Sequence, residues 1–242
     1  MGHCLSRFRL LISYFKFPNF GCFSETDIIS DDSLEAVREV VTALRSNVQI
    51  IGQGWIFRGE TALQRGIVLE IVLAIEKGNL RHLRNLLDSG WRLEASQALY
   101  TFLTRLSQPL IPHSIQSLVL DDNGHVPVEI VATDVLGLMK QELSDRHFQL
   151  VSILLNLLDT VIKVSPADEL RGNTLPISML PFFFNIQSQH INEWRRIATI
   201  FVELIRLASQ RIEAGHASNV RFRGDCNNLE VYERSNTNRI LE

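Results

Sequence analysis

Apolar residues recur every three or four positions along most of the chain, and this spacing places them on one face of an α-helix. The stripes predict helices over 33–46, 63–77, 80–90, 94–106, 128–142, 144–166 and 194–208. Strict alternation of apolar and polar residues, which would indicate half-buried strands, is scarce. The pattern therefore predicts an all-α domain of about seven to nine helices.

Capping residues and helix breakers mark the ends of several of these helices. Asp32 is expected to cap the first helix, with Glu35 three residues on as its reciprocal partner. Gly78 follows the second helix at the position where a left-handed residue commonly ends a helix. Pro109 and Pro112 stop the helix before them, because proline has no backbone N–H to donate.

The stretch 144–166 is the most hydrophobic part of the chain. Its apolar residues cover most of the helix circumference, which is typical of a helix at the centre of a domain. A shorter apolar element over 175–186 is interrupted by Pro181. His147 and His190 lie near predicted helix starts, so we expect them to be capping or surface groups rather than metal ligands.

The pattern divides the chain into three parts. Residues 1–27 hold several phenylalanines without a clean period and are interpreted as an N-terminal extension. Residues 28–213 carry the helical stripes and form the predicted domain. Residues 214–242 are rich in Asn, Arg and Ser, and this polarity predicts a mostly disordered tail.

Composition and charge limit the classes of function. Of the 242 residues, 45% are hydrophobic and 21% charged, which is enough apolar material for a well-packed core. The net charge of −3 gives no electrostatic argument for nucleic-acid binding, and no basic run or RNA-binding aromatic motif appears. No uninterrupted apolar run reaches the roughly 18 residues of a membrane span.

Neither the cysteines nor any familiar catalytic motif indicates a cofactor or a metal site. Cys4, Cys22 and Cys226 are few and lack the C-x-x-C spacing, which argues against both a disulfide framework and a zinc site. This usage favours a reducing, cytoplasmic compartment. Phosphate-binding loops, dinucleotide fingerprints and metalloprotease signatures are missing. Any chemistry is therefore expected on a partner, and the sequence leaves open whether the chain counts as an enzyme.

The first six residues, "MGHCLS", match the pattern for N-myristoylation. Gly2 would be exposed after removal of the methionine, and Ser6 occupies the position the pattern requires. Cys4 offers a site for a palmitoyl chain, and two acyl chains make a stable membrane anchor where one does not. A secretory signal and an unmodified, disordered start are the alternatives.

One arginine stands out in the stretch "GQGWIFRGET" at 52–61. Arg58 follows an apolar triplet, and glycines on both sides let the backbone bend, because glycine reaches positive φ at little cost. Apolar anchoring beside a flexible bend would present the guanidinium to something outside the chain. The alternative interpretation is a surface arginine at a helix start.

Four segments resemble the Rho GTPase-activating protein (RhoGAP) domain in order and approximate spacing, over about 33–210. They are "GWIFRGETALQRGIVLEIVLAIEKGN", "ASQALYTFLTRLSQPLIPHSIQSLV", "HFQLVSILLNLLDTVIKVS" and "LPISMLPFFFNI" with the last amphipathic helix. The first is similar to the family's arginine loop, and the second to its helix and following prolyl turn. The resemblance implies a single helical RhoGAP-like domain.

The resemblance also implies a partner and a role for Arg58. The partner would be a Rho-family small GTPase in its GTP-bound form, and Arg58 would be the finger that enters the GTPase active site. A guanidinium stays protonated and offers several planar donors to the charge that develops on the phosphate oxygens. In GTPases such an arginine is worth about 10³–10⁵ in rate.

The chain departs from the family pattern around this arginine. Trp55 intervenes between the glycine and I-F-R, and Glu60 brings a carboxylate near the expected phosphates. Tyr100 and Thr104 stand where the family carries a supporting lysine and arginine. Further departures are Ser107 and Gln108 in the prolyl turn, and Ile177 near an expected asparagine.

Three hypotheses remain from the sequence. The first is a divergent but active GTPase-activating protein. The second is a catalytically degenerate RhoGAP-like module that binds a GTPase or another signalling partner. The third is a lipid-anchored helical adaptor whose last helix binds acidic partners or phosphoinositides through Arg195, Arg196, Arg206 and Arg211. The alternative interpretation of these four arginines is an ordinary solvated helix face.

Overall fold

The computed structural model describes residues 28–47, 63–121, 125–164 and 179–225. These residues form nine α-helices, one short 3-10 helix and no strands. The α-helices are α2 (Asp31–Arg45), α4 (Arg65–Glu76), α5 (Leu80–Asp88), α6 (Arg92–Thr104), α7 (His113–Leu120), α8 (Val128–Glu142), α9 (Asp145–Val164), α11 (Leu180–Phe183) and α12 (Trp194–Asp225), and the 3-10 helix is η2 (Ser188–Ile191). The predicted all-α class and number of helices are confirmed.

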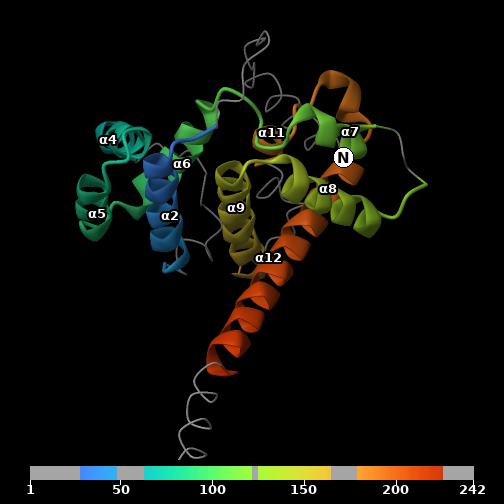
Figure 1. Cartoon of the computed structure of the whole chain (residues 1–242). Coiled ribbons are helices and arrows are strands. Elements are labelled where there is room, and N and C mark those ends of the chain that lie inside the picture. Colours follow the sequence, from blue (N-terminus) through green and yellow to red (C-terminus); the bar gives the residue numbers. More distant parts are fainter. Residues whose placement is uncertain (1–27, 48–62, 122–124, 165–178, 226–242) are drawn as a thin grey trace, which may run out of the picture.

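Helix α9 lies between two groups of helices (Figure 1). On one side it packs against α2, which also contacts α4, α5 and α6. On the other side it packs against α12, whose most extensive contact is with α8. The prediction of a central helix from the apolar circumference of 144–166 is therefore confirmed.

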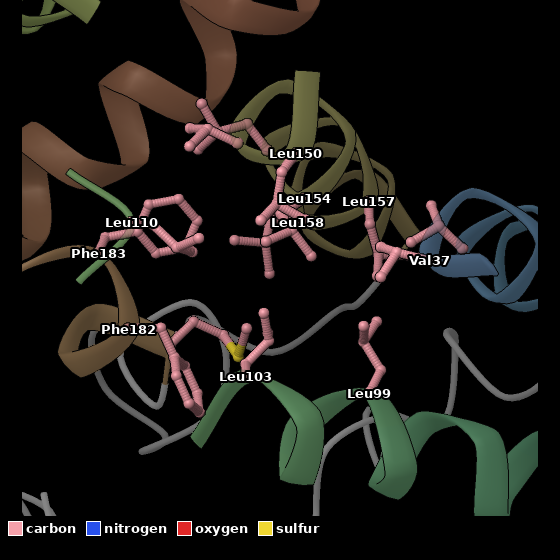
Figure 2. Packing of buried hydrophobic residues seen from close by; sticks show 14 of the residues in the cluster. Val37, Leu99, Leu103, Leu110, Leu150, Leu154, Leu157, Leu158, Phe182 and Phe183 are labelled. Atoms are coloured by element: carbon pink, nitrogen blue, oxygen red, sulfur yellow. The ribbon is translucent and has the colours of Figure 1, made fainter. Parts of the chain in front are cut away.

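Figure 2 shows how the core is filled between these helices. Leu154, Leu157 and Leu158 of α9 are about 1% exposed and face Leu99 of α6 and Val37 of α2 across the interior. Burying one such side chain contributes roughly 1.5–3 kcal/mol relative to leaving it in water. The leucine-rich face of α9 thus joins the two helix groups into one core.

Helix α9 is also, by length and composition alone, long and apolar enough to cross a membrane. Half of its most apolar 18-residue window is buried inside the protein. Its packing against α2 and α12 is that of a central helix of a helical domain. The hydrophobic composition of this segment is therefore explained by the core.

The ends of the helices confirm some of the predicted caps and correct another. The N-cap of α2 is Ser30, not Asp32, because the Ser30 hydroxyl accepts a hydrogen bond from the Ser33 amide at 3.2 Å. Gly78 follows α4 with a φ of 62°, as predicted for a left-handed C-terminal residue. Gly90 plays the same part after α5 with a φ of 92°.

The prolyl segment after α6 is tied to α11 through the backbone. The amides of Leu110 and Ile111 donate to the carbonyls of Phe182 and Phe183 at 2.8 and 3.2 Å. Pro181 lies in the first turn of α11, where its missing N–H costs nothing, so it helps to start this helix rather than interrupting one. These bonds fix the chain where it leaves α6.

Two buried polar side chains complete this junction. His147 Nε2 lies 2.7 Å from the carbonyl oxygen of Leu110, and the residue is 7% exposed, so it belongs to the interior and is not the surface group expected from the sequence. Gln116 Nε2 donates to the carbonyl of Ile111 at 2.5 Å, and its Oε1 accepts from the amide of Asn185 at 2.8 Å. Both side chains satisfy backbone groups that would otherwise be buried without partners.

Two helical elements go beyond the predicted pattern. Helix α7 was not predicted, because its eight residues follow Pro112 at once and carry only a short apolar stripe. Helix α12 continues to Asp225, past Ala214 where the apolar stripe ends. Its predicted inward stripe is confirmed, since Trp194, Ile197, Phe201, Leu204, Ile205 and Ala208 are all buried.

Candidate functional site

The predicted site residues fall outside the described residues. Arg58 lies in 48–62 together with Trp55 and Glu60, Gly2 and Cys4 lie in 1–27, and Ile177 lies in 165–178. The structure therefore describes the helices before and after the arginine segment and not the arginine. Helix α2 precedes that segment and ends at Arg45, and α4 begins just after it at Arg65.

The helices on both sides of the arginine segment belong to the same packed group. The Asn47 amide donates to the carbonyl of Leu44 at 3.1 Å and closes α2. The Ser33 hydroxyl near the start of α2 donates to the carbonyl of Glu76 at the end of α4, at 3.0 Å. Both helices also pack against α6. The segment that carries Arg58 is thus flanked on each side by a helix of the same packed group.

The start of α4 is fastened to α6 by a side chain from the interior. The Gln64 amide lies 3.4 Å from a carboxylate oxygen of Glu94, and the Glu94 side chain is buried, at 7% exposed. This contact joins residues 30 positions apart. The sequence did not predict this contact, because no local pattern marks a hydrogen bond between two helices.

Tyr100 and Thr104 occupy the two α6 positions where the family resemblance expects bases, and neither supplies a cation. The Tyr100 ring packs edge-on against Phe182 with 4.9 Å between ring centroids, and burial raises the pKa of its phenol. Thr104 is exposed, and its hydroxyl donates to the carbonyl of Thr101 at 2.6 Å. Tyr100 therefore anchors α6 to α11, whereas Thr104 faces solvent.

One cation does lie at this end of α6, and sequence matching missed it. Arg105 follows Thr104 directly, and its guanidinium lies 2.8 Å from the carboxylate of Glu76 on α4. Both side chains are partly exposed, so the pair is worth no more than roughly 1 kcal/mol. It helps to hold the C-terminal ends of α4 and α6 together.

Helix α4, which follows the arginine segment in the sequence, exposes apolar side chains. Leu69 is 49% and Leu73 47% exposed, and the two are one helical turn apart. At a rise of about 1.5 Å per residue, Leu69 is roughly 7–8 Å along the axis from Gln64, the N-cap of α4. Nearby, His82 Nε2 and the Glu70 carboxylate are 2.8 Å apart. These two half-exposed leucines form a small apolar surface with polar neighbours.

The last helix offers less free positive charge than its sequence indicates. The Arg206 guanidinium binds the Glu203 carboxylate through two nitrogens, at 3.0 and 2.6 Å. The Arg195 guanidinium lies 5.6 Å from the Trp194 ring centre. The expected role of Arg211 rests on a side chain outside the described residues. This face therefore gives little support to the phosphoinositide-binding adaptor.

The histidines and carboxylates of the described ranges do not converge. Among those residues, no group of three or more His, Cys, Asp or Glu side chains could hold a metal ion. His190 acts as the predicted capping group, because its Nδ1 accepts the Gln187 amide at 3.0 Å at the start of η2.

Comparisons with known proteins add no relative. The chain matches no protein-family model, no curated protein and no solved structure.

Proposed function

We propose that the chain is a GTPase-activating protein for a Rho-family small GTPase, with Arg58 as its arginine finger. The observation that carries the proposal is the ordered sequence resemblance, which puts I-F-R between two helices. The described structure is compatible with it, because α2 and α4 hold the two ends of the arginine segment within one helical domain.

Apart from a positioned arginine, the proposed chemistry requires few groups from this chain. Hydrolysis of GTP shifts charge onto the oxygens between the β and γ phosphates, and a guanidinium held there stabilises that charge without any proton transfer. The finger must be attached firmly, since the entropy of ordering a loose segment would offset its benefit. Asn47 and Gln64, at the two ends of the segment, adjoin packed helices, which supports this part of the proposal.

Leu69 and Leu73 are proposed to contact the GTPase beside the finger. They lie on the helix that follows the arginine segment and are half-exposed in a domain whose other large apolar side chains are mostly buried. Their burial against a partner would add affinity without taking part in the chemistry. A charged substitution there should therefore raise the KM for the GTPase and leave kcat nearly unchanged.

The binding module without catalysis is the second candidate. The observation that favours it is the lack of a cation at Tyr100 and Thr104. A finger without its supporting bases would still bind the GTP-bound form and would stimulate hydrolysis weakly or not at all. The two candidates share the partner and differ in the rate of hydrolysis.

A panel of Rho-family GTPases assayed with wild type and Arg58→Ala separates these candidates. We expect wild type to stimulate at least one GTPase and Arg58→Ala to lose about 10³-fold or more of that stimulation while still binding. Arg81→Ala, at an exposed arginine on α5, is the matched control and should behave as wild type. Equal stimulation by wild type and Arg58→Ala would refute the finger. Capture of a GTP-bound GTPase without stimulation would favour the binding module.

The contact surface on α4 has its own test. Leu69→Glu and Leu73→Glu should each raise the KM by roughly tenfold, while Ile130→Glu, on α8 at 51% exposed, should not. If all three variants had the wild-type KM, the α4 leucines would not be part of the contact.

Attachment to a membrane is the remaining part of the proposal. Acylation of Gly2 and Cys4 would hold the domain at the cytoplasmic face, where lipid-modified GTPases are found. Gly2→Ala should move the protein from the membrane fraction to the soluble fraction, and Cys4→Ser should do so in part. Unchanged fractionation of Gly2→Ala would exclude the myristoyl anchor.

A further inference from the structure

The large apolar side chains that remain exposed lie on two helices. Among the described residues they are Leu69 and Leu73 on α4 and Ile130 on α8, each about half exposed. Figure 1 shows α4 and α8 on opposite sides of the central helix α9. They belong to different helix groups, since α4 packs against α2, α5 and α6, whereas α8 packs against α7 and α12. The domain therefore carries two separate apolar faces.

The face on α4 has a cation at each end. One exposed row, here called the α4 row, runs along the helix at four-residue spacing and consists of Arg65, Leu69, Leu73 and Lys77. Its two cations have no ion-pair partner within 4.0 Å in the described part of the chain. The nearby acids are engaged, because Glu70 lies 2.8 Å from His82. Glu76 likewise lies 2.8 Å from Arg105. The row thus presents two leucines between two unpaired positive charges.

The face on α8, here called the α8 face, has acids on both sides of its apolar side chain. Glu129 precedes Ile130, Asp134 follows it by one helical turn, and all three are exposed. Neither carboxylate has an ion-pair partner within 4.0 Å among the residues that the structure describes. Glu129 attracts the charge of Arg206 on α12, but Glu203 already binds that guanidinium through two nitrogens. The α8 face is therefore negative where the α4 row is positive.

We propose that the α4 row of one chain binds the α8 face of a second copy of this chain. Ile130 lies between Leu69 and Leu73 of the other copy, because side-chain rows at four-residue spacing fit into one another when helices pack. Each cation of the α4 row is about 9 Å along the axis from the middle of the leucine pair, and Asp134 is about 6 Å from Ile130. Charge selects this pairing, since two α4 rows or two α8 faces would bring like charges together.

The two faces differ and lie on opposite sides of α9, so the copies join head to tail. Such a contact leaves one free face at each end, and the assembly grows until it closes into a ring or continues as an open chain. The contact is small beside the roughly 20–30 residues per side of a standard interface, so it is weak and transient. We expect a Kd on the order of 10⁻⁴ M for each contact, weakened by salt because the charges are exposed.

Self-association would also regulate the proposed activity, and in this respect alone the inference rests on the proposed function. A second copy covers Leu69 and Leu73, the side chains proposed to meet the GTPase. Stimulation of GTP hydrolysis per chain should therefore fall as the chain concentration passes the Kd. Ile130→Glu, which leaves the α4 row uncovered, should keep the stimulation of the dilute protein.

Sedimentation equilibrium of the full chain measures the association without any GTPase. A reductant is present, so that no disulfide joins two chains. Between about 10 and 500 μM the average mass of wild type should rise well above the mass of one chain. Leu73→Glu and Ile130→Glu should each raise the Kd at least about tenfold. Arg81→Glu, at an exposed arginine on α5, is the control and should associate as wild type does.

A mixture of the two apolar variants tests which faces meet. Leu73→Glu keeps its α8 face and Ile130→Glu keeps its α4 row, so one intact contact can form between them. The mixture should approach twice the mass of one chain and stop there, whereas wild type should grow further. Formation of this dimer also shows that both variants are folded.

Exchange of charges tests the role of the ion pairs. One variant carries Arg65→Glu and Lys77→Glu, and the other carries Glu129→Lys and Asp134→Lys. Each alone should associate at least about tenfold more weakly than wild type, because like charges then meet. Their mixture should regain association, because opposite charges face one another again.

The outcomes decide the proposal. A wild-type chain that stays monomeric at about 500 μM overturns it. Association that Ile130→Glu leaves unchanged also overturns it, because the α4 row would then meet another surface. The same holds for a mixture of Leu73→Glu and Ile130→Glu that never exceeds the mass of one chain. If wild type stimulates no GTPase, the proposed function fails and the regulation fails with it, while the measured masses still decide whether α4 binds α8.

Discussion

The Ser209 hydroxyl donates a 2.7 Å hydrogen bond to a carboxylate oxygen of Asp159, with both side chains buried. The two residues are 50 positions apart and join α12 to the central helix α9. The same carboxylate oxygen lies 2.8 Å from the Lys163 ammonium group one turn further along α9. A buried acid is thus satisfied by one neighbour from each helix.

Removing the hydroxyl should cost more than removing an exposed one. Ser209→Ala removes one of the two groups that bind the buried Asp159 carboxylate and leaves Lys163 in place, and a hydrogen bond to a charged group contributes about 1.5–3 kcal/mol. Ser117→Ala, on the exposed side of α7, should change the free energy of unfolding by less than about 0.5 kcal/mol. Urea unfolding of both variants measures the difference. Equal stability of the two would mean that the α9–α12 bond contributes nothing.

Gly78 gives a prediction in which three glycines are compared. An added Cβ at Gly78 would lie 2.2 Å from the Cβ of Asp32, and the residue has a φ of +62°. Gly78→Ala therefore combines strain with a collision against the start of α2, and should cost at least about 2 kcal/mol. Gly90→Ala has the strained φ without the collision and should cost roughly 1–2 kcal/mol. Gly137→Ala, in open space inside α8, should stabilise by about 0.5–1 kcal/mol.

Unfolding free energies of these three variants, measured under one set of conditions, give the ranking. A Gly78→Ala variant no worse than Gly90→Ala would mean that α2 and α4 meet less closely than the contact indicates.

His190 should make stability depend on pH below neutrality. Burial lowers the pKa of its imidazole from the ordinary value of 6.5, against a smaller opposing effect of Asp121. In the unfolded chain the group therefore binds a proton at a higher pH than in the folded protein. Stability is full above about 6.5 and falls as the pH drops toward the folded pKa. Protonation would also break the bond in which Nδ1 accepts the Gln187 amide.

The measurement is the midpoint of urea unfolding across this range. His190→Asn keeps an acceptor near Nδ1 but does not titrate, so its midpoint should fall less than that of wild type as the pH is lowered. His125→Asn, at an exposed histidine, should keep the wild-type dependence. Identical pH profiles for wild type and His190→Asn would contradict the prediction.

The long helices could be predicted from the sequence because each carries its own periodic stripe. The apolar residues of α9 even indicated its central place, since they cover most of the circumference of the helix. The short elements could not be predicted in the same way, because α7 and α11 depend on contacts between distant segments. One is the hydrogen bond that Gln116 of α7 accepts from the amide of Asn185, 69 residues away. The cap of α2 was assigned to the wrong residue because "SDDS" offers four capping side chains, and only the extended backbone of Ser30 decides among them.

The candidate site, like the fold, could be predicted from the sequence only in part. Matching of segments located Tyr100 and Thr104 on α6, and the helix is where it was expected. The contact between Glu94 and Gln64 leaves no local trace, because it joins two helices whose approach is set by the packing of α4 on α6. Capping from within one helix can be recognised in a sequence, whereas capping from a neighbouring helix requires the fold.

A cationic side chain should have different effects on stability at positions 100 and 104. Tyr100→Lys removes a ring that packs edge-on against Phe182 and puts an ammonium group at a half-buried position, so it should destabilise the domain by about 1–3 kcal/mol. Thr104→Arg places its guanidinium in solvent in the last turn of α6, where a positive charge is favourable, and should leave stability within about 0.5 kcal/mol of wild type. Thermal unfolding of the two variants tests this contrast.

The same two variants test why Tyr100 and Thr104 stand where the family resemblance expects a lysine and an arginine. If the proposed function holds, Thr104→Arg should increase the stimulation of GTP hydrolysis, because it restores a cation at a position where the family resemblance expects one, at no structural cost. Tyr100→Lys should fail to do so, since its lysine would replace a packing contact between α6 and α11. A stable Tyr100→Lys variant with higher activity would show that the tyrosine is a catalytic loss and not an anchor of the fold.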